Sequence, residues 1–351
     1  MTTEVICDNT IQLPSKKRYT QIDILKAVCA FMVVCIHIQF PGKFGACFKD
    51  ISRIAVPIFF IITGFFYFDI VKKNSQLKQI KKICCMILFA NLLFFIAGIL
   101  AGILNGSGVV NELHKLNLHS LIIFIFFNES PFSGHLWYLN AVCYTLIAVY
   151  FANKSLKGMK ILYCLTPILL LADLALGKYS LVLLGIDFKD VFYVRNFLFV
   201  GIPYFCLGNI IRKLNDRNRL NIKKSTLIIL IVIFSLTTLF ESYILGVYNM
   251  SATREHYIST TPLSILVFIY FLSEDFNYLP NFIIDKLSCI GRDFSALIYI
   301  VHPLLIAIVG KFHNQTALFE PIIVYVLSIV SVMCFKYFLS KIKNLKTKHQ
   351  F

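Results

Sequence analysis

A lysine and a histidine in one apolar segment are the first residues of this sequence that could do chemistry together. Lys26 and His37 both fall within residues 22–40, and Asp23 precedes Lys26 by three positions. At 100° per residue, a helix brings Lys26 and His37 to within about 20° of the same face, with His37 about 16 Å further along. Asp23 lies about 40° to the other side of His37. Ionisable groups inside an apolar helix are costly and by default indicate function.

A structural explanation of this stripe stays open beside the functional one. Asp23 and Lys26 can pair with each other, and His37 can bond to a carbonyl oxygen. Periodicity alone does not choose between the two.

Other polar and aromatic residues fall near the ends of further apolar segments, at a similar predicted depth. They are Arg53, His135, Trp137, Arg195, Asn196, Glu241, Tyr299 and His302. In a compact bundle these residues would surround one cavity with His37 in its wall. Each of them also has a simpler explanation, such as an interfacial anchor, a member of an aromatic belt or a ring that fills a proline kink.

Histidine and arginine together suit two kinds of chemistry in such a cavity. Neutral imidazole takes a proton from a hydroxyl near neutral pH, and arginine in a dry site stabilises an oxyanion. The set therefore favours acyl transfer to an alcohol, or proton-coupled transport. The eight histidines are scattered, with no H-x-x-x-H or C-x-x-C spacing, so we expect no metal site.

The composition shows what kind of fold must position these residues. Of 351 residues, 58% are hydrophobic and 15% are charged, against roughly 45–50% and about 25% in soluble domains. A soluble fold could not hide 34 Phe and 17 Tyr without large exposed patches. We therefore predict an all-α integral membrane protein, and we exclude a disordered chain, a disulfide-rich secreted module and a nucleic-acid-binding domain.

About 20 apolar residues are needed to cross a bilayer as a helix. Ten segments meet this need, at about 22–40, 52–70, 83–104, 135–152, 160–176, 191–211, 225–248, 257–273, 294–313 and 317–340. The apolar run 119–127 is about 13 Å long as a helix. We predict that it lies at the interface or re-enters, and we do not count it as a span.

Ten spans place both termini on one side, and the basic residues indicate which side. With cytoplasmic termini, the inner segments hold 23 Lys and Arg and the outer segments hold 8, in agreement with the positive-inside tendency. We predict a cytoplasmic tail over 1–21, a transmembrane domain over 22–340 and a basic cytoplasmic tail over 341–351. The polar first twenty residues have no apolar stretch, so no cleavable signal peptide is expected.

Five segments, in order, resemble motifs of the membrane acyltransferase 3 family. Asp23-Ile-Leu-Lys26 with His37 is similar to the opening motif, in which ten residues separate a basic residue from a histidine. The other four are AVPIFFIITGFF (55–66), HLWYL (135–139), RNFLFVGIPYFCLG (195–208) and SALIYIVHP (295–303). The resemblance runs from about 18 to about 310, nearly the whole membrane portion.

The resemblance implies a ten-helix enzyme that uses cytosolic acyl-CoA, usually acetyl-CoA, to O-acylate a saccharide or related acceptor. It implies that His37 is the catalytic histidine, and that Lys26 takes the place of the more usual arginine, whose planar fork lysine lacks. We assign catalytic roles to His37, Lys26 and Arg195, and leave open whether Lys26 acts only in donor binding. Substrate binding is assigned to Asp23, Arg53, His135, Trp137, Glu241, Tyr299 and His302.

The variants AVPIFF and RNFLFVGIP look most like a subgroup that includes the membrane half of the vancomycin-resistance serine racemases. The present sequence has no soluble racemase half, so we expect no racemase activity.

The function predicted from the sequence is a membrane O-acyltransferase of a bacterial plasma membrane. The phosphates of acyl-CoA would meet Lys26 and the basic inner loops 72–82 and 212–224, and the envelope saccharide would enter from the outer side. Two alternatives stay open: a transporter for serine or another small polar solute, and a structural or regulatory membrane partner.

Overall fold

The computed structural model describes residues 19–106, 109–188, 190, 193–250, 256–312 and 317–348, with backbone only over 343–348. All regular elements in these ranges are helical. The predicted tail over 1–21 therefore lies almost entirely outside the described residues.

Nine helical segments in the described ranges are long and apolar enough to cross a membrane. They are α1 (Thr20–His37), α3 (Ala55–Lys72, after α2, Gly42–Ser52), α4 (Gln76–Leu104), α7 (Trp137–Lys154, after η1, Gly134–Leu136), α8 (Gly158–Leu176), α10 (Ile202–Asp216, after η3, Phe197–Gly201), α11 (Lys224–Val247), α14 (Ser295–Val309, after α13, Asn281–Cys289, and η4, Ile290–Phe294) and α16 (Glu320–Lys348). The prediction of an all-helical integral membrane bundle is confirmed.

The eighth predicted span is shorter than expected. Residues 257–273 were predicted to cross, but the helix there, α12, covers only Thr260–Ser273, about 21 Å against a core of roughly 30 Å. The chain enters α12 through a turn in which the Tyr257 amide donates to Thr260 Oγ1 at 2.9 Å. The helix α12 packs against α1, α3 and α11, and Tyr257 and Ser259 of the turn before it are buried.

The ninth predicted span begins earlier than expected. It was predicted over 294–313, but a helical segment runs from Asn281 to Phe312. The wide turn η4 inside it allows close packing, since a Cβ on Gly291 would lie 1.7 Å from the carbonyl oxygen of Asp23. Glycine is therefore required where this segment crosses α1.

The apolar run predicted to lie at the interface forms a short helix, α6 (Leu118–Phe127). Ten residues are too few to cross a bilayer, and none of them is buried. The prediction that this run is not a span is confirmed. Between α4 and α6 lies α5 (Val110–His114).

The helices α3 and α10 share the most extensive contact among the described helices. A Cβ on Gly64 would lie 2.0 Å from the carbonyl oxygen of Phe205, and one on Gly208 would lie 2.0 Å from that of Ile61. Small residues that let two backbones approach are typical of helix contacts in membranes.

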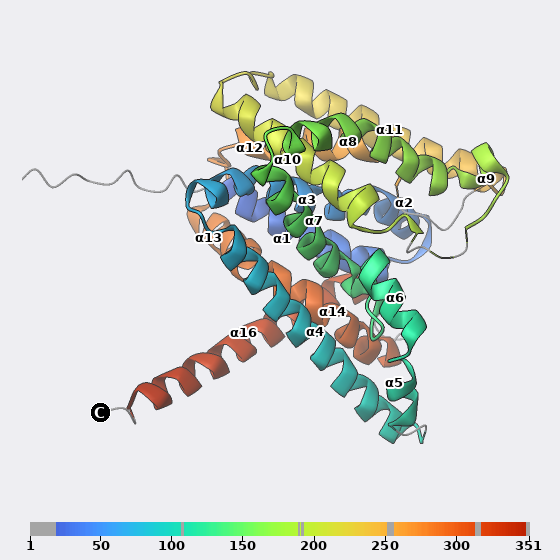
Figure 1. Cartoon of the computed structure of the whole chain (residues 1–351), viewed down its shortest axis with the longest axis vertical. Helices are drawn as coiled ribbons and strands as arrows, with labels where there is room; N and C mark the ends of the chain where they lie inside the picture. The colour runs from blue at the N-terminus through green and yellow to red at the C-terminus, as the bar shows by residue number, and fades with distance from the viewer. Residues whose placement is uncertain are drawn as a thin grey trace, which may run out of the picture.

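Figure 1 shows the two ends of the bundle. The helix α13 and the last turns of α16 lie on the left, and α2, α6 and α9 (Ser180–Leu184) lie on the right. The start of α1 also lies on the left. It contacts the end of α12, where Gln21 Nε2 donates to the carbonyl oxygen of Leu272. That the left end faces the cytoplasm stays a prediction from the basic residues.

Candidate functional site

Three histidine rings contact one another where α1, η1 and α14 meet. His37 ends α1, His135 lies in η1, and His302 lies in the middle of α14. The ring centroids of His37 and His302 are 5.1 Å apart, those of His135 and His302 are 5.5 Å apart, and those of His37 and His135 are 6.5 Å apart. Three of the predicted site residues are therefore brought together from distant parts of the sequence.

The three rings differ in their access to the outside. His302 has no exposed surface and His135 is 8% exposed, whereas His37 is exposed. A substrate entering from the outer end would therefore meet His37 first, with the other two rings behind it.

Hydrogen bonding determines the tautomer of neutral His302. Its Nδ1 lies 3.1 Å from the carbonyl oxygen of Ile298, and a carbonyl oxygen can only accept. Nδ1 therefore carries the proton, and Nε2 of the neutral ring is an acceptor. Among the residues that the structure describes, this Nε2 has no hydrogen-bond partner.

Aromatic side chains hold the histidines in place. The Tyr299 hydroxyl donates to the backbone carbonyl of His135, and the ring of Tyr138 lies 5.2 Å from that of Tyr299. Phe94 contacts the His135 ring at 4.8 Å. Tyr299 thus lies beside the histidines, and its hydroxyl is already used to fix the backbone of η1.

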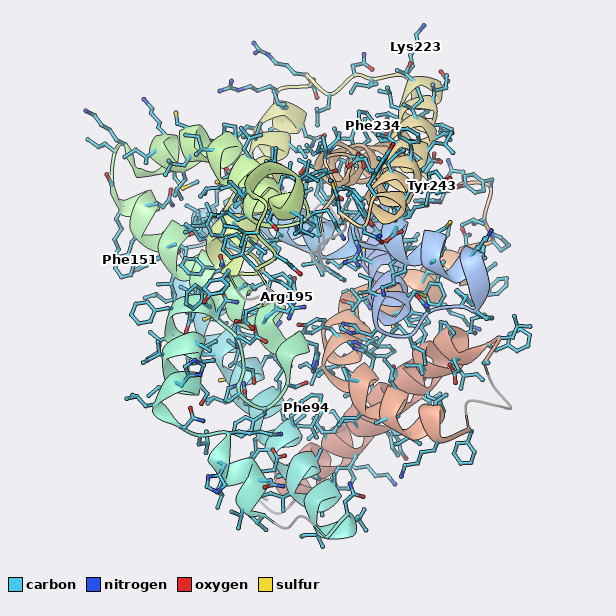
Figure 2. All side chains as sticks on the ribbon, turned by 90° about the vertical axis from the view of Figure 1, so that its right-hand side faces the viewer. Phe94, Phe151, Arg195, Lys223, Phe234 and Tyr243 are labelled. Atoms are coloured by element: carbon cyan, nitrogen blue, oxygen red, sulfur yellow. The ribbon has the colours of Figure 1, made fainter. Side chains whose placement is uncertain are left out.

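Arg195 and Trp137 form a second part of the site. Trp137 lies two residues after His135 in the chain. The Arg195 guanidinium lies 5.5 Å from the centre of the Trp137 ring, and its Nη2 is 4.0 Å from Glu129 Oε1. Figure 2 shows Arg195 toward the middle of the molecule, whereas Lys223 projects from its outline. Burial raises the pKa of the Glu129 carboxyl above its ordinary value, although Arg195 opposes the shift.

The sequence did not indicate Asn128, which fixes this part of the site. Fully buried and in the left-handed region (φ 57°), Asn128 ends α6. Its Oδ1 accepts from the Phe197 amide at 2.8 Å and its Nδ2 donates to the Trp137 carbonyl at 3.2 Å. Its backbone carbonyl accepts from Asn140 Nδ2 at 3.0 Å. The available signal was an asparagine directly after an apolar helix, a common left-handed helix end.

Asn196 is explained by secondary structure. Its Oδ1 accepts from the amides of Leu198 and Phe199, at 2.9 Å and 3.1 Å, so it caps η3.

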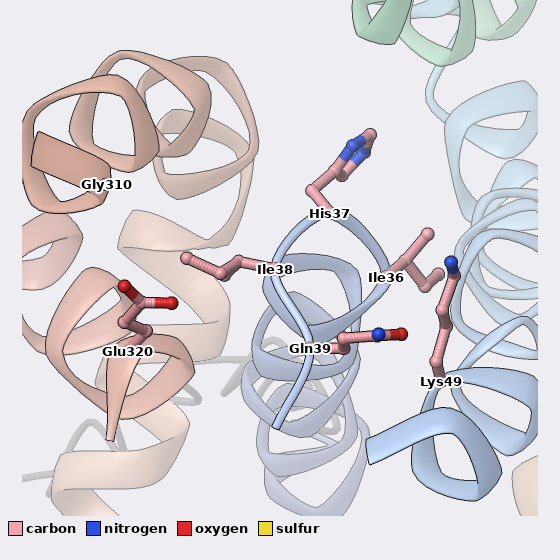
Figure 3. Close-up of a pocket in the computed structure, with 7 residues that line it drawn as sticks. All are labelled: Ile36, His37, Ile38, Gln39, Lys49, Gly310 and Glu320. Carbon is pink, nitrogen blue, oxygen red and sulfur yellow. The ribbon is translucent and has the colours of Figure 1, made fainter. Parts of the chain in front are cut away.

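A hollow of about 420 Å³ opens beside His37, at the end of the bundle that is predicted to face outward. Figure 3 shows His37 at its edge, with Lys49 and Glu320 on either side of the end of α1. The lining residues are Ile36, His37, Ile38, Gln39, Lys49, Gly310 and Glu320. Sequence reasoning had found only His37 among them.

Lys26 and Asp23 lie at the opposite end of α1 from His37. Lys26 Nζ is 3.0 Å from Asp23 Oδ1 and 5.4 Å from the centre of the Phe66 ring. The local ion pair that the sequence offered as a structural explanation is therefore present. The structure does not bring Lys26 or Asp23 to the three histidines.

Arg53 also lies apart from the histidines, in a polar cluster where α2 meets α11 and α12. Its Nε is 3.7 Å from Asp50 Oδ1. Asp50 in turn accepts from the Tyr257 hydroxyl at 3.0 Å and from Ser242 Oγ at 2.6 Å. Arg53 thus belongs to a network that joins three segments.

Glu241 belongs to the same outer end and caps the start of α12. It accepts from the Tyr179 hydroxyl and from the amides of Ile258 and Ser259, at 2.8 Å and 3.1 Å. The expectation of one cavity shared by all these residues is therefore corrected. Arg53 and Glu241 have contacts that stabilise the fold, and the histidines form a separate group.

No group of three or more His, Cys, Asp or Glu side chains in the described part of the chain is placed to hold a metal ion. The three histidines are within that search.

Comparisons with known proteins show the family of the chain. A family model described as an acyltransferase domain matches residues 19–341. An amino-acid racemase of Enterococcus faecalis is 27% identical over 320 residues, which cover 84% of this chain and 42% of that protein. The chain thus spans about two fifths of the length of this curated relative. No solved structure matches the chain.

Proposed function

The chain belongs to the membrane acyltransferase 3 family, whose acyltransferase model spans residues 19–341, and on that premise we propose that it is an O-acetyltransferase of the cell envelope. It moves an acetyl group from cytosolic acetyl-CoA to a hydroxyl of a saccharide that enters from the outer side of a bacterial plasma membrane. The observation that carries the proposal is the exposed His37 ring beside the outer hollow, backed by two buried histidines.

The inner end of the bundle offers cations for the phosphates of the donor. Arg212 is occupied, because it binds Asp69 at 3.1 Å and Asp216 at 2.9 Å. Exposed lysines lie in the turn between α3 and α4 and in the first two turns of α4: Lys73, Lys78, Lys81 and Lys82. We therefore assign the phosphates to these lysines and to Lys26, from which the thioester reaches along α1 toward His37.

In the reaction, His37 takes the proton of the acceptor hydroxyl as its oxygen attacks the thioester carbonyl. The tetrahedral oxyanion collapses as the C–S bond breaks, and the thiolate of CoA takes the proton back from His37. The new C–O bond is the ester of the product. Arg195, held against Trp137, is the cation assigned to the oxyanion.

The buried histidines assist by accepting hydrogen bonds. A protonated His37 has two N–H donors, and Nε2 of His302 is an acceptor without a protein partner on a ring 5.1 Å away. A neutral acceptor suits this position, because a carboxylate as buried as His302 would be costly unless paired.

The test is transfer of labelled acetyl from acetyl-CoA in membranes that contain the protein. We expect label in an envelope saccharide, and we expect His37→Ala to lower the rate at least 100-fold, the usual contribution of a general base. His119→Ala, on the exposed surface of α6, is the control and keeps the rate. Full activity in His37→Ala would refute the base, and solute uptake that needs no acetyl-CoA would refute the transferase.

A further inference from the structure

The hollow beside His37 carries one positive and one negative side chain on separate walls. Lys49 lies in the last turn of α2, and Glu320 begins α16. Figure 3 shows them on opposite sides of the end of α1, with Gln39 between them. The hollow is therefore dipolar, with His37 at its edge.

Lys49 has no side-chain partner to neutralise it. It forms no ion pair or hydrogen bond with any residue that the structure describes, although it is half-buried. The next residue, Asp50, is already used by Ser242 and Tyr257. A partly buried ammonium without a counter-charge is unfavourable, and an anion bound beside it would relieve that cost.

The opposite wall suits hydroxyl groups. Glu320 is 3% exposed and borders the hollow, and the two oxygens of a carboxylate accept several hydrogen bonds, so that one can come from a sugar hydroxyl. The Gln39 amide can donate or accept. A ligand that fits both walls carries an anionic group on one side and hydroxyls on the other.

From these observations we infer that the hollow binds an acidic sugar unit, with Lys49 on its anionic group and a hydroxyl presented to His37. A volume of about 420 Å³ lies within the range of ligand pockets. The inference rests on the proposed function and names the class of acceptor. A neutral sugar would leave Lys49 without a counter-charge and would therefore be the poorer acceptor.

The test compares two acceptors that differ in one group, methyl β-glucuronide and methyl β-glucoside. In sealed membranes supplied with labelled acetyl-CoA on the inner side, we expect kcat/KM to be about tenfold higher for the glucuronide. Lys49→Met lowers the ratio of kcat/KM for the glucuronide to kcat/KM for the glucoside to about one, and Lys49→Arg retains the preference.

Lys43→Met is the matched control on the same helix. Lys43 is exposed and does not line the hollow, and it lies about 120° around α2 from Lys49. The variant has the same change in net charge, so it reports any general effect of surface potential. We expect it to keep the preference for the glucuronide.

Two results would overturn the inference while the proposed function stands. One is equal transfer to both glycosides by the wild type, and the other is an equal loss of kcat/KM with both glycosides in Lys49→Met. Binding of the two glycosides to the protein in lipid nanodiscs, followed by saturation-transfer NMR, decides the charge preference without turnover. Selective binding of the glucuronide without transfer to any acceptor would refute the proposed function and keep the binding site.

Discussion

Replacing His302 with phenylalanine tests whether the buried histidines take part in catalysis. Phenylalanine keeps an aromatic ring of similar size in a site with no exposed surface, so it fills the space between Ile298 and His37. It removes the acceptor Nε2, which has no hydrogen-bond partner among the described residues. The substitution therefore separates the loss of a hydrogen-bond acceptor from the loss of packing.

The expected loss of activity follows from one hydrogen bond to a charged group. Such a bond contributes about 1.5–3 kcal/mol, which corresponds to a loss of about 10- to 150-fold in rate. The hydrogen bond from His37 to His302 is needed when His37 holds the proton, and it is not needed when acetyl-CoA binds. We therefore expect kcat to fall by that factor while KM for acetyl-CoA stays within about twofold.

A second variant keeps the result interpretable. His302→Gln places an amide oxygen near the position of Nε2, and we expect it to recover most of the lost rate. Both variants are compared per folded protein, measured by size-exclusion chromatography in detergent. Full activity in His302→Phe, or equal losses in the two variants, would refute the role of Nε2 as an acceptor.

Two further predictions concern the part of the site around Arg195. The pKa of Glu129 is raised by burial, so the folded state holds its proton to higher pH than the unfolded state, and the stability from this group is lost as the pH rises through the folded pKa. Between pH 4 and pH 8, the Tm of Glu129→Gln should therefore rise relative to that of the wild type, and a constant difference would contradict this. Asn128→Ala removes two side-chain hydrogen bonds and places alanine at φ 57°, and we expect it to lower the free energy of unfolding by about 2–5 kcal/mol. Asn128→Gly, which tolerates that φ, should lose about 1 kcal/mol less in denaturant titrations, and equal losses would show that backbone strain has no part.

Several features of the fold could be predicted because they depend on local sequence. Apolar length predicts a crossing helix, since the bilayer thickness is fixed, and nine of the ten predicted spans meet that length. The helix α12 was predicted over 257–273, but its later start was not, because the turn before it depends on Glu241, a residue from another helix.

The candidate site was predicted in part for the same reason. His37, His135 and His302 were selected because histidine is rare inside apolar segments, and they do contact one another. The same reasoning also selected Arg53 and Glu241, whose partners lie in a different cluster. The depth of a residue along its helix can be predicted from the sequence, but the neighbouring helix that its side chain faces cannot.

The sequence by itself determined that this protein is a helical membrane protein of the acyltransferase 3 family, because hydrophobicity and motif order are properties of the chain read in one dimension. Only the tertiary structure decided that Lys26 pairs with Asp23, that His302 lies behind His37, and that Lys49 and Glu320 border one hollow. The physical reason is that the histidine contact and the hollow each depend on which faces of separate helices pack together. That choice is made by close contacts such as Gly64 on Phe205, which no single segment encodes.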